Sequence, residues 1–217
     1  MPLCGSRFLL TACLLLSALV ALGGCQVNPT TGERMLALYG WDWEREVGAQ
    51  AAPGMVDQFG GATPDTAVQS YVDEVGQRLL GGIEEGVPPL DWEFTLLDSP
   101  VINAFALPGG KVFLSRGLAA KLDSEAEMAG VIGHEIGHVT ARHGNQRISQ
   151  ATLAQLGLAA AAVAVDVADE DTILAQYGSV GLPALSVGGN LVMLSYGRGD
   201  ELEADMLGIR YMTRAGD

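Results

Sequence analysis

The sequence predicts a predominantly helical α+β domain in which a small β-sheet or hairpin lies beside a long central helix. Apolar residues recur at helical spacing in several segments, and they alternate with polar residues at strand spacing between 92 and 115. One segment, 125–143, carries signals for both ends of a helix. Without residues 1–24 the chain has 217 − 24 = 193 residues, which is enough for one domain with a buried core.

The first 24 residues have the features of a secretory signal peptide. Arg7 is the one charge ahead of an apolar run, Phe8 to Leu22, that is short for a membrane-spanning helix. The run ends in Leu22-Gly23-Gly24-Cys25, which resembles the bacterial lipoprotein box. By that resemblance Cys25 is the lipidated first residue of the mature protein. An ordinary signal peptide and an uncleaved anchor are the alternatives.

Residues 25–40 are polar and rich in turn-forming residues, so we expect a tether between the lipid and a domain that covers 41–217. Gln26 stands where many bacterial lipoproteins of the inner membrane carry Asp. By that resemblance the protein is expected on the periplasmic side of the outer membrane, in a bacterium of the Gram-negative type.

Cysteine content and charge narrow the chemistry. Cys4, Cys13 and Cys25 are the three cysteines, so the chain beyond them has no thiol for disulfides, cysteine catalysis or a cysteine metal site. Loss of Arg7 with the signal peptide leaves 11 basic and 26 acidic residues, a net charge of 11 − 26 = −15. Nucleic-acid binding needs a basic face, so we expect no nucleic-acid partner.

The elements around the central helix follow from hydrophobic periodicity and turn residues. In the helix after residue 63, Thr63 is expected to be the N-cap and Pro64 the first helical residue. The full set comprises helices over 42–52, 64–79 and 200–213, a strand at 92–96, and a hairpin of 101–107 with 111–115 across Pro108-Gly109-Gly110.

The central helix has well-marked ends. Ser124 and Glu127 form a capping box, and Gly144 is expected to provide the left-handed stop. Three glycines lie along one side, Gly130, Gly133 and Gly137. Each costs roughly 1 kcal/mol relative to Ala in a helix interior, so we expect another backbone to approach them closely.

Two further segments are strongly apolar, 151–167 and 173–194, with an acidic stretch, 166–171, expected to form a solvated turn between them. We expect buried helices here. A membrane hairpin or a partner contact is the alternative, although the first run is short and contains Gln155.

The motif His134-Glu135-Ile136-Gly137-His138 lies inside the central helix. Two histidines four residues apart project from one face, so both imidazoles can reach one tetrahedral ion. Glu135, one position round the helix, can lie beside a metal-bound water as general base. The motif therefore predicts a catalytic zinc site.

A catalytic zinc site usually has three protein ligands. His143 is half a turn out of phase with His134 on a continuing helix, so we expect it to be a helix-end cation near the C-terminal dipole. The third ligand is then a carboxylate, and Glu201 is the candidate.

Glu201 shares one helical face with Ala204, Asp205 and Gly208. The two small residues would let this helix approach the glycine-lined one, and Asp205 could accept a hydrogen bond from a ligand imidazole. Glu203 is expected to point into solvent. An exposed acidic helix start, stabilised by the helix dipole, is the alternative to this ligand assignment.

Three stretches together resemble the CAAX-prenyl-protease-type zinc metallopeptidases, in their periplasmic lipoprotein branch. They are Asn103-Ala104-Phe105-Ala106-Leu107-Pro108-Gly109-Gly110, the His134–His138 motif with Val139-Thr140-Ala141-Arg142-His143, and Glu201-Leu202-Glu203-Ala204-Asp205. The similarity runs from about Asn28 to the end of the chain. Family members continue past the position of Asp217, so the domain is expected to be incomplete at its C-terminus.

The resemblance implies a gluzincin fold, one zinc ion per chain and endopeptidase activity on misfolded or misassembled envelope proteins. The outer-membrane assembly machinery is a candidate partner. An extended substrate is expected to add as a strand near Asn103, Ala104 and Phe105.

Two alternative functions are an envelope chaperone or assembly factor with structural zinc, and a zinc amidase or peptidase acting on cell-wall material. Structural zinc usually has four protein ligands, and the three found here favour catalysis.

Overall fold

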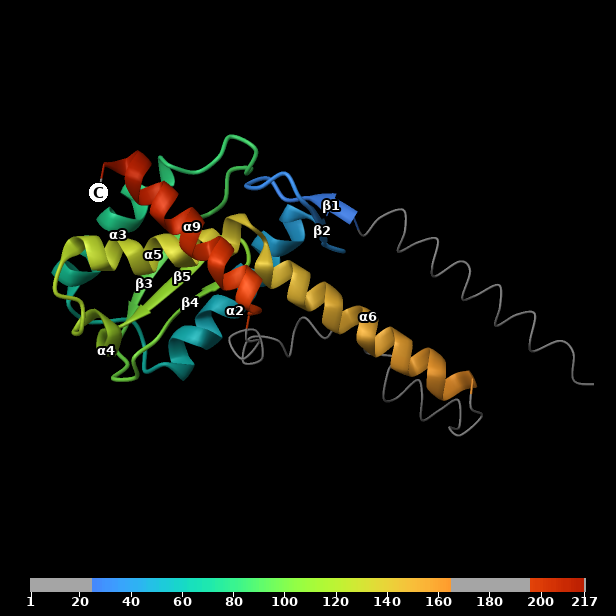
Figure 1. The fold of residues 1–217 in the computed structure, drawn as a ribbon. Helices are drawn as coiled ribbons and strands as arrows, with labels where there is room; N and C mark the ends of the chain where they lie inside the picture. The colour runs from blue at the N-terminus through green and yellow to red at the C-terminus, as the bar shows by residue number, and fades with distance from the viewer. Residues whose placement is uncertain (1–24, 165–195, 217) are drawn as a thin grey trace, which may run out of the picture.

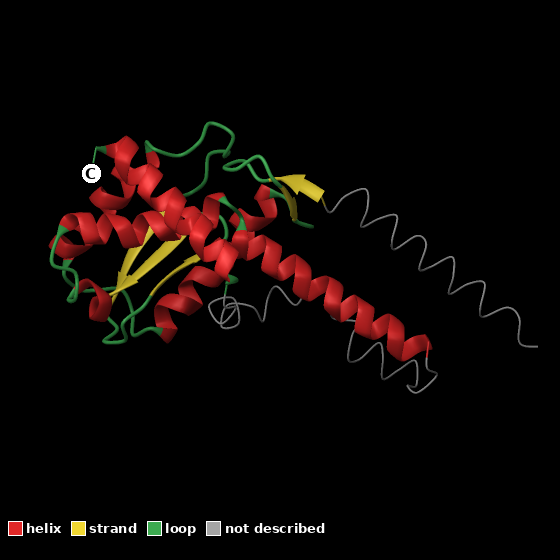
Figure 2. Ribbon diagram, in the orientation of Figure 1, coloured by secondary structure: helices red, strands yellow, loops and turns green. Residues whose placement is uncertain are grey.

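The computed structural model describes residues 25–164 and 196–216, and it confirms the predicted fold class (Figures 1 and 2). The helices are α2 (Trp41–Gln58), α3 (Thr66–Leu80), α4 (Arg116–Ala119), α5 (Glu125–Thr140), α6 (His143–Ala164) and α9 (Arg198–Ala215). The strands are β1 (Cys25–Val27), β2 (Arg34–Leu36), β3 (Glu93–Leu97), β4 (Ala104–Leu107) and β5 (Lys111–Ser115). The predicted signal peptide and the segment 173–194 lie outside the described residues.

The main sheet has three strands in the order β3-β5-β4, with β3 parallel and β4 antiparallel to β5. The predicted hairpin is therefore confirmed. Its turn uses Gly109 and Gly110 at φ of +83° and +98°, a backbone conformation that side chains disfavour. A Cβ on Gly109 would lie 2.6 Å from the Cα of Arg45, so the turn packs directly on α2. Among the residues that the structure describes, β4 is an edge strand of this sheet.

Helix α5 lies over the sheet, and α9 crosses α5 on the side away from it (Figure 1). The apolar residues between these layers form one buried core. Its members come from α3, the sheet, α5 and α9, and include Val72, Val75, Leu79, Phe94, Leu114, Ile132, Ile136, Leu207 and Tyr211. The central helix is thus held on both sides, which fixes the direction of the side chains along it.

The N-cap of α3 differs from the prediction. Asp65, not Thr63, caps the helix, because its carboxylate accepts hydrogen bonds from the N–H groups of Ala67 and Val68 at 3.1 and 3.2 Å. Thr63 instead accepts a bond from the N–H of Asp65 through its hydroxyl at 3.3 Å. A carboxylate placed at the positive end of the helix dipole is the better acceptor here.

The central helix has the predicted N-cap and ends earlier than predicted. The other half of the predicted capping box differs, because the carboxylate of Glu127 accepts a hydrogen bond from the N–H of Asp123 at 2.7 Å. Ser124 accepts a hydrogen bond from the N–H of Glu127 at 3.2 Å, as an N-cap should. The helix stops at Thr140 instead of continuing to His143, and the left-handed residue is Arg142, at φ 61°, not Gly144. The chain then starts α6 at His143, so the prediction of one helix from 125 to 143 was wrong.

Residues 25–40, predicted to be a tether, are folded against the domain instead. β1 and β2 pair antiparallel, and Asn28 is 3% exposed. The amide of Gln26 donates to the carbonyl of Ala37 at 2.7 Å, and that of Asn28 donates to Glu203 at 2.7 Å. Specific polar partners on the domain therefore order a segment whose composition is typical of a linker.

Helix α6 extends away from the rest of the domain (Figure 1). Burial was predicted for 151–167, but Ala151, Ala154 and Gln155 are exposed, so that prediction does not hold for this part of the helix. None of the helices that the structure describes combines the length and apolar character needed to cross a membrane.

The predicted backbone contact at the glycine-lined face is confirmed. A Cβ on Gly137 would lie 2.9 Å from the carbonyl oxygen of Ala204, and one on Gly133 would lie 3.2 Å from the Cα of Gly208. A Cβ on Gly208 would in turn lie 2.9 Å from the backbone nitrogen of His134. Gly130 is different, since it meets only the sulfur of Met212 at 3.9 Å. α5 and α9 therefore touch backbone to backbone along Gly133 and Gly137.

We predict that Gly137→Ala destabilises the protein, because the new methyl group collides with the backbone of α9. Overpacking of this kind costs about 1–3 kcal/mol, which thermal unfolding would detect. Gly130→Ala is the matched control on the same helix. It has room for the methyl group and gains helix propensity, so we expect an unchanged or higher Tm. Equal Tm values for the two variants would contradict the packing described here.

Candidate active site

Three predicted ligand residues meet where α5 and α9 cross. His134 and His138 come from α5 and Glu201 from α9, and one ligand atom of each lies within 4.8 Å of the other two. The Nε2 atoms of the two histidines are 3.0 Å apart. Glu201 places one carboxylate oxygen 3.5 Å from Nε2 of His134 and the other 3.8 Å from Nε2 of His138.

These separations fit a single small cation. Ligand atoms at about 2.0–2.1 Å from a tetrahedral zinc ion are roughly 3.3 Å apart, and the three observed separations lie on either side of this value. Two imidazoles and one carboxylate are also a donor set that leaves a fourth position for water or substrate. The site can therefore hold a metal ion.

Each histidine has a polar partner on its second nitrogen. Asp205 Oδ1 lies 2.8 Å from Nδ1 of His134, as predicted from the position of Asp205 on α9. The partner of His138 is His143, whose Nδ1 lies 2.8 Å from Nδ1 of His138. These contacts restrain the rotation of both rings, which keeps their Nε2 atoms directed to the same point.

His143 is therefore not the helix-end cation near a C-terminal dipole that the sequence suggested. It is buried at the start of α6, because the chain turns at Arg142 and carries His143 back beneath His138. On a continuing helix this contact would not form. The sequence prediction assumed one unbroken helix through His143, so it placed the His143 side chain on the wrong side of the helix.

Glu203 was expected to point into solvent, and this was wrong. It accepts the hydrogen bond from Asn28, and its other carboxylate oxygen lies 3.5 Å from Nε2 of His143. The neighbouring imidazole of His143 is the largest contribution lowering the pKa of Glu203, while burial acts in the opposite direction. The N-terminal segment packs on this side of α9 through Asn28, and it thereby shields Glu203 from solvent.

Glu135 lies beside the ligand group and is almost fully buried. Burial raises the pKa of its carboxyl group to about 8, and the negative charge of Glu201 contributes in the same direction. A carboxylate with a raised pKa is a stronger proton acceptor near neutral pH than an exposed one.

The environment of His138 favours its neutral form. Burial, with the neighbouring His143 and His134 acting in the same direction, lowers the pKa of its imidazole to about 3. A neutral imidazole has the lone pair that a metal ion requires. This ring can therefore act as a ligand without first losing a proton.

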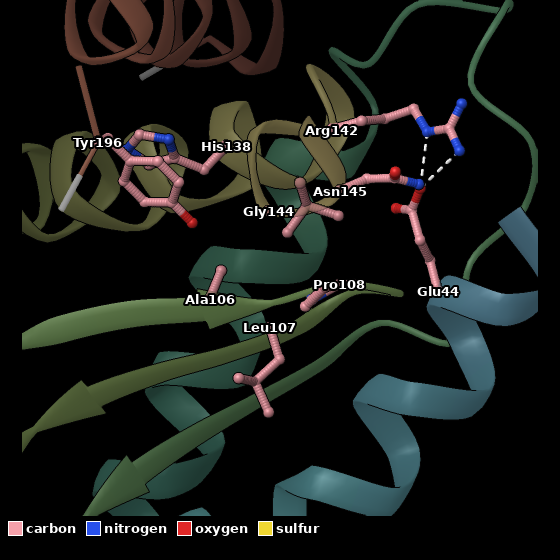
Figure 3. A pocket seen from close by; sticks show the side chains of 10 residues that line it. Glu44, Ala106, Leu107, Pro108, His138, Arg142, Gly144, Asn145 and Tyr196 are labelled. Carbon is pink, nitrogen blue, oxygen red and sulfur yellow. Dashed lines mark hydrogen bonds and ion pairs between the residues drawn. The ribbon is translucent and has the colours of Figure 1, made fainter. Parts of the chain in front are cut away.

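Tyr196, just before α9, is a site residue that the sequence did not reveal. Its ring stacks on His138 with centroids 4.0 Å apart and an interplanar angle of 17° (Figure 3). Burial and the charges of Glu135 and Glu201 raise the pKa of its hydroxyl well above the ordinary value. Tyr196 thus covers one face of the ligand imidazole as a neutral phenol. No motif surrounds it in the sequence.

A groove of about 740 Å³ runs past the ligand group. Its walls include Asn103 and Ala104 at the start of β4 together with His134, Glu135 and Asp205. Phe105, the third residue of the predicted substrate strand, directs its ring into a buried cluster, where it stacks on Phe113 at 4.9 Å.

A buried ion pair holds the turn between α5 and α6. Arg142 donates from Nε to Glu44 on α2 at 2.7 Å, and Asn145 donates to the same carboxylate oxygen at 2.6 Å (Figure 3). Arg142 also donates to the side-chain oxygen of Gln26 and to the carbonyl of Tyr39. Burial raises the pKa of Glu44, and Arg142 and Asn145 act against this rise.

The fold and the site together define the class of protein. Two histidines four residues apart on a helix over a small sheet, a carboxylate from a crossing helix and a buried acid between them form the arrangement of a zincin-like metallopeptidase. Residues 66–217 match Peptidase family M48, and the chain belongs to this family. The family resemblance seen in the sequence is thereby confirmed.

The chain is similar to proteins that are named as proteases or peptidases in several organisms. The chain is 32% identical over 156 residues to the beta-barrel assembly-enhancing protease of Yersinia pestis, covering 70% of this chain and 30% of that protein. It is 35% identical over 158 residues to a putative protein of the same name from Vibrio cholerae, with coverage of 70% and 31%. It is 27% identical over 211 residues to the mitochondrial metalloendopeptidase OMA1 of Schizosaccharomyces pombe, with coverage of 91% and 57%. The chain thus spans about a third to just over half of these relatives.

We predict that Glu44→Gln destabilises the fold by roughly 3 kcal/mol, because it leaves the buried guanidinium of Arg142 without a countercharge. Denaturant unfolding would measure the loss. Glu46→Gln, an exposed position on the same helix, is the control and should change the free energy of unfolding by less than about 0.5 kcal/mol. If both variants unfold at the same denaturant concentration, the ion pair does not stabilise the turn.

Proposed function

We propose that this chain is a zinc-dependent endopeptidase domain. The observation that carries the proposal is the convergence of His134, His138 and Glu201 from two helices on one point. Family membership supports peptidase chemistry, and the three-ligand donor set supports a catalytic ion with an open position. Zinc is the ion that this combination of imidazole and carboxylate ligands favours in peptidases.

The ligand residues and their partners have separate tasks. His134, His138 and Glu201 would hold the ion. Asp205 would fix the tautomer of His134 by accepting a hydrogen bond from its Nδ1–H group. When bound, zinc supplies Lewis-acid chemistry that activates water and polarises the scissile carbonyl group. The protein's own contribution is to hold these side chains in fixed positions on the packed helices α5 and α9.

Glu135 is the proposed general base. It is buried beside the ligand atoms, and its raised pKa suits it to take a proton from the attacking water. The same carboxylic acid would then pass that proton to the leaving amine, which restores Glu135 to its ionised form. Its position in the helix, one residue after His134, keeps it on the substrate side of the ligand group.

The substrate is proposed to bind as an extended strand along β4. β4 has one strand neighbour among the described residues, so its other edge offers backbone hydrogen bonds. Asn103 and Ala104 line the groove that also contains Glu135, which brings a strand on this edge close to the ligand group. Main-chain recognition would give low sequence selectivity, and it requires an unfolded segment.

The proposed substrates are misfolded or misassembled proteins of the bacterial envelope. Relatives named for enhancing beta-barrel assembly support this choice and also make the outer-membrane assembly machinery a candidate partner. The lipoprotein-like ending at Cys25 supports a periplasmic protein anchored by lipid to the outer membrane.

Two variants should separate chemistry from metal binding. Glu135→Gln keeps the ligand set, so we expect about one zinc ion per chain and a loss of casein cleavage of at least 100-fold. Glu201→Ala removes a ligand, so we expect loss of both zinc and cleavage. Zinc content by elemental analysis and cleavage with and without a chelator are the measurements.

Glu74→Gln, at an exposed position on α3, is the control for both variants and should match the unmodified protein. Cleavage retained by Glu135→Gln would remove that residue from its proposed role. Unchanged zinc content in Glu201→Ala would show that another residue is the third ligand.

The anchor is tested separately in cells that process lipoproteins. We expect the full chain to incorporate labelled fatty acid and to fractionate with outer membranes, and Cys25→Ser to do neither. Cys13→Ser is the control and should behave like the unmodified chain. Labelling that survives Cys25→Ser would rule out this attachment site.

A further inference from the structure

We propose that His143, Glu203 and Asn28 form a hydrogen-bonded relay that positions the ligand His138, so that the segment after Cys25 is part of the metal site. This inference rests on the proposed function, since it concerns the same ligand group. Its members come from three separate regions: Asn28 after β1, His143 at the start of α6 and Glu203 on α9.

The first step of the relay joins the two imidazoles. Nδ1 of His138 and Nδ1 of His143 are 2.8 Å apart, and both side chains are at most 3% exposed. One of these nitrogens must donate and the other accept. Nε2 of His138 faces the other ligand atoms and needs its lone pair for the ion, so its proton lies on Nδ1. His138 is then the donor and His143 the acceptor.

That choice fixes the proton of His143 on Nε2. This nitrogen is buried and has no hydrogen-bond partner within normal distance among the described residues. The nearest acceptor is the carboxylate of Glu203, 3.5 Å away. A buried N–H group without an acceptor is costly, so we infer that Glu203 accepts a hydrogen bond from this N–H group.

The far end of the relay is fixed by Asn28. Its side-chain oxygen accepts from the backbone N–H of Thr30 at 2.9 Å, and a backbone N–H can only donate. The amide of Asn28 must therefore direct its NH2 group to Glu203, which accepts at 2.7 Å. Asn28 thus holds one oxygen of Glu203 and leaves the other facing His143.

Each of the two proposed ligand histidines therefore has a carboxylate behind its ring, one in direct contact and the other through a second imidazole. His134, half-buried, meets the carboxylate of Asp205 directly. His138, buried, reaches the carboxylate of Glu203 through the ring of His143. A carboxylate behind a ligand imidazole fixes the ring and raises its basicity, and loss of such a partner weakens metal binding by about 10–100-fold.

Zinc affinity of the full chain, measured by competition with a chromogenic chelator, tests the relay without any substrate. His143→Phe keeps a ring and removes both nitrogens, so we expect about 10–100-fold weaker binding. Glu203→Gln and Asn28→Ala should weaken binding in the same direction and by less. The double variant His143→Phe with Glu203→Gln should bind no more weakly than His143→Phe, because the relay is already broken at the ring.

Two controls separate positioning from general damage. Leu202→Ala changes an exposed residue next to Glu201 and should leave zinc affinity unchanged. His143→Asn can place its amide oxygen near the position of Nδ1, and the shorter side chain has no donor at the position of Nε2. It should therefore recover part of the affinity and be insensitive to Glu203→Gln. Thermal unfolding of the metal-free forms identifies any variant that is simply misfolded.

Unchanged zinc affinity in folded His143→Phe would overturn the relay, and so would full additivity in the double variant. Neither result would affect the proposed peptidase activity, because casein cleavage by the unmodified chain is measured independently. Absence of zinc binding by the unmodified chain would instead remove the proposed function and the relay together.

Discussion

The close contact between α5 and α9 is the constraint on which the site depends. Glu201 reaches the histidines because no side chain separates the two helices at Gly133, Gly137 and Gly208. An added Cβ at any of these positions would meet backbone atoms at 2.9–3.2 Å, and backbone cannot move aside as a flexible side chain can. The glycines lower the intrinsic stability of α5, and the packing of α9 compensates for this loss.

The second determinant is the turn at Arg142. A non-glycine residue at positive φ is disfavoured by roughly 1–2 kcal/mol, so the turn needs support from outside the helix. The buried pair of Arg142 with Glu44 gives this support, together with the hydrogen bond from Asn145. The turn at Arg142 separates α5 from α6 and places His143 against His138. The motif sets the positions of His134 and His138, and the helix break sets the position of His143 beside them.

The N-terminal segment completes the same region from the other side. Gln26 contacts Arg142, and Asn28 contacts Glu203, so the residues that directly follow Cys25 lie against both the turn and α9. The segment after Cys25 is therefore packed against the domain and contributes to the surroundings of the site.

The sequence alone determined the fold class, the hairpin, the start of the central helix and the glycine-lined contact, because each depends on local periodicity, capping or backbone freedom. It also identified His134, His138, Glu201 and Asp205, since helical spacing sets which residues share a face. Only the tertiary structure decided the places of His143, Glu203 and Tyr196. The positions of His143 and Glu203 depend on a helix break stabilised by Glu44, nearly 100 residues away in the chain, and on the docked segment after Cys25. Tyr196 is placed by its stacking on His138. Contacts of this range leave no periodic signal in the sequence, and they decide which polar residues are buried.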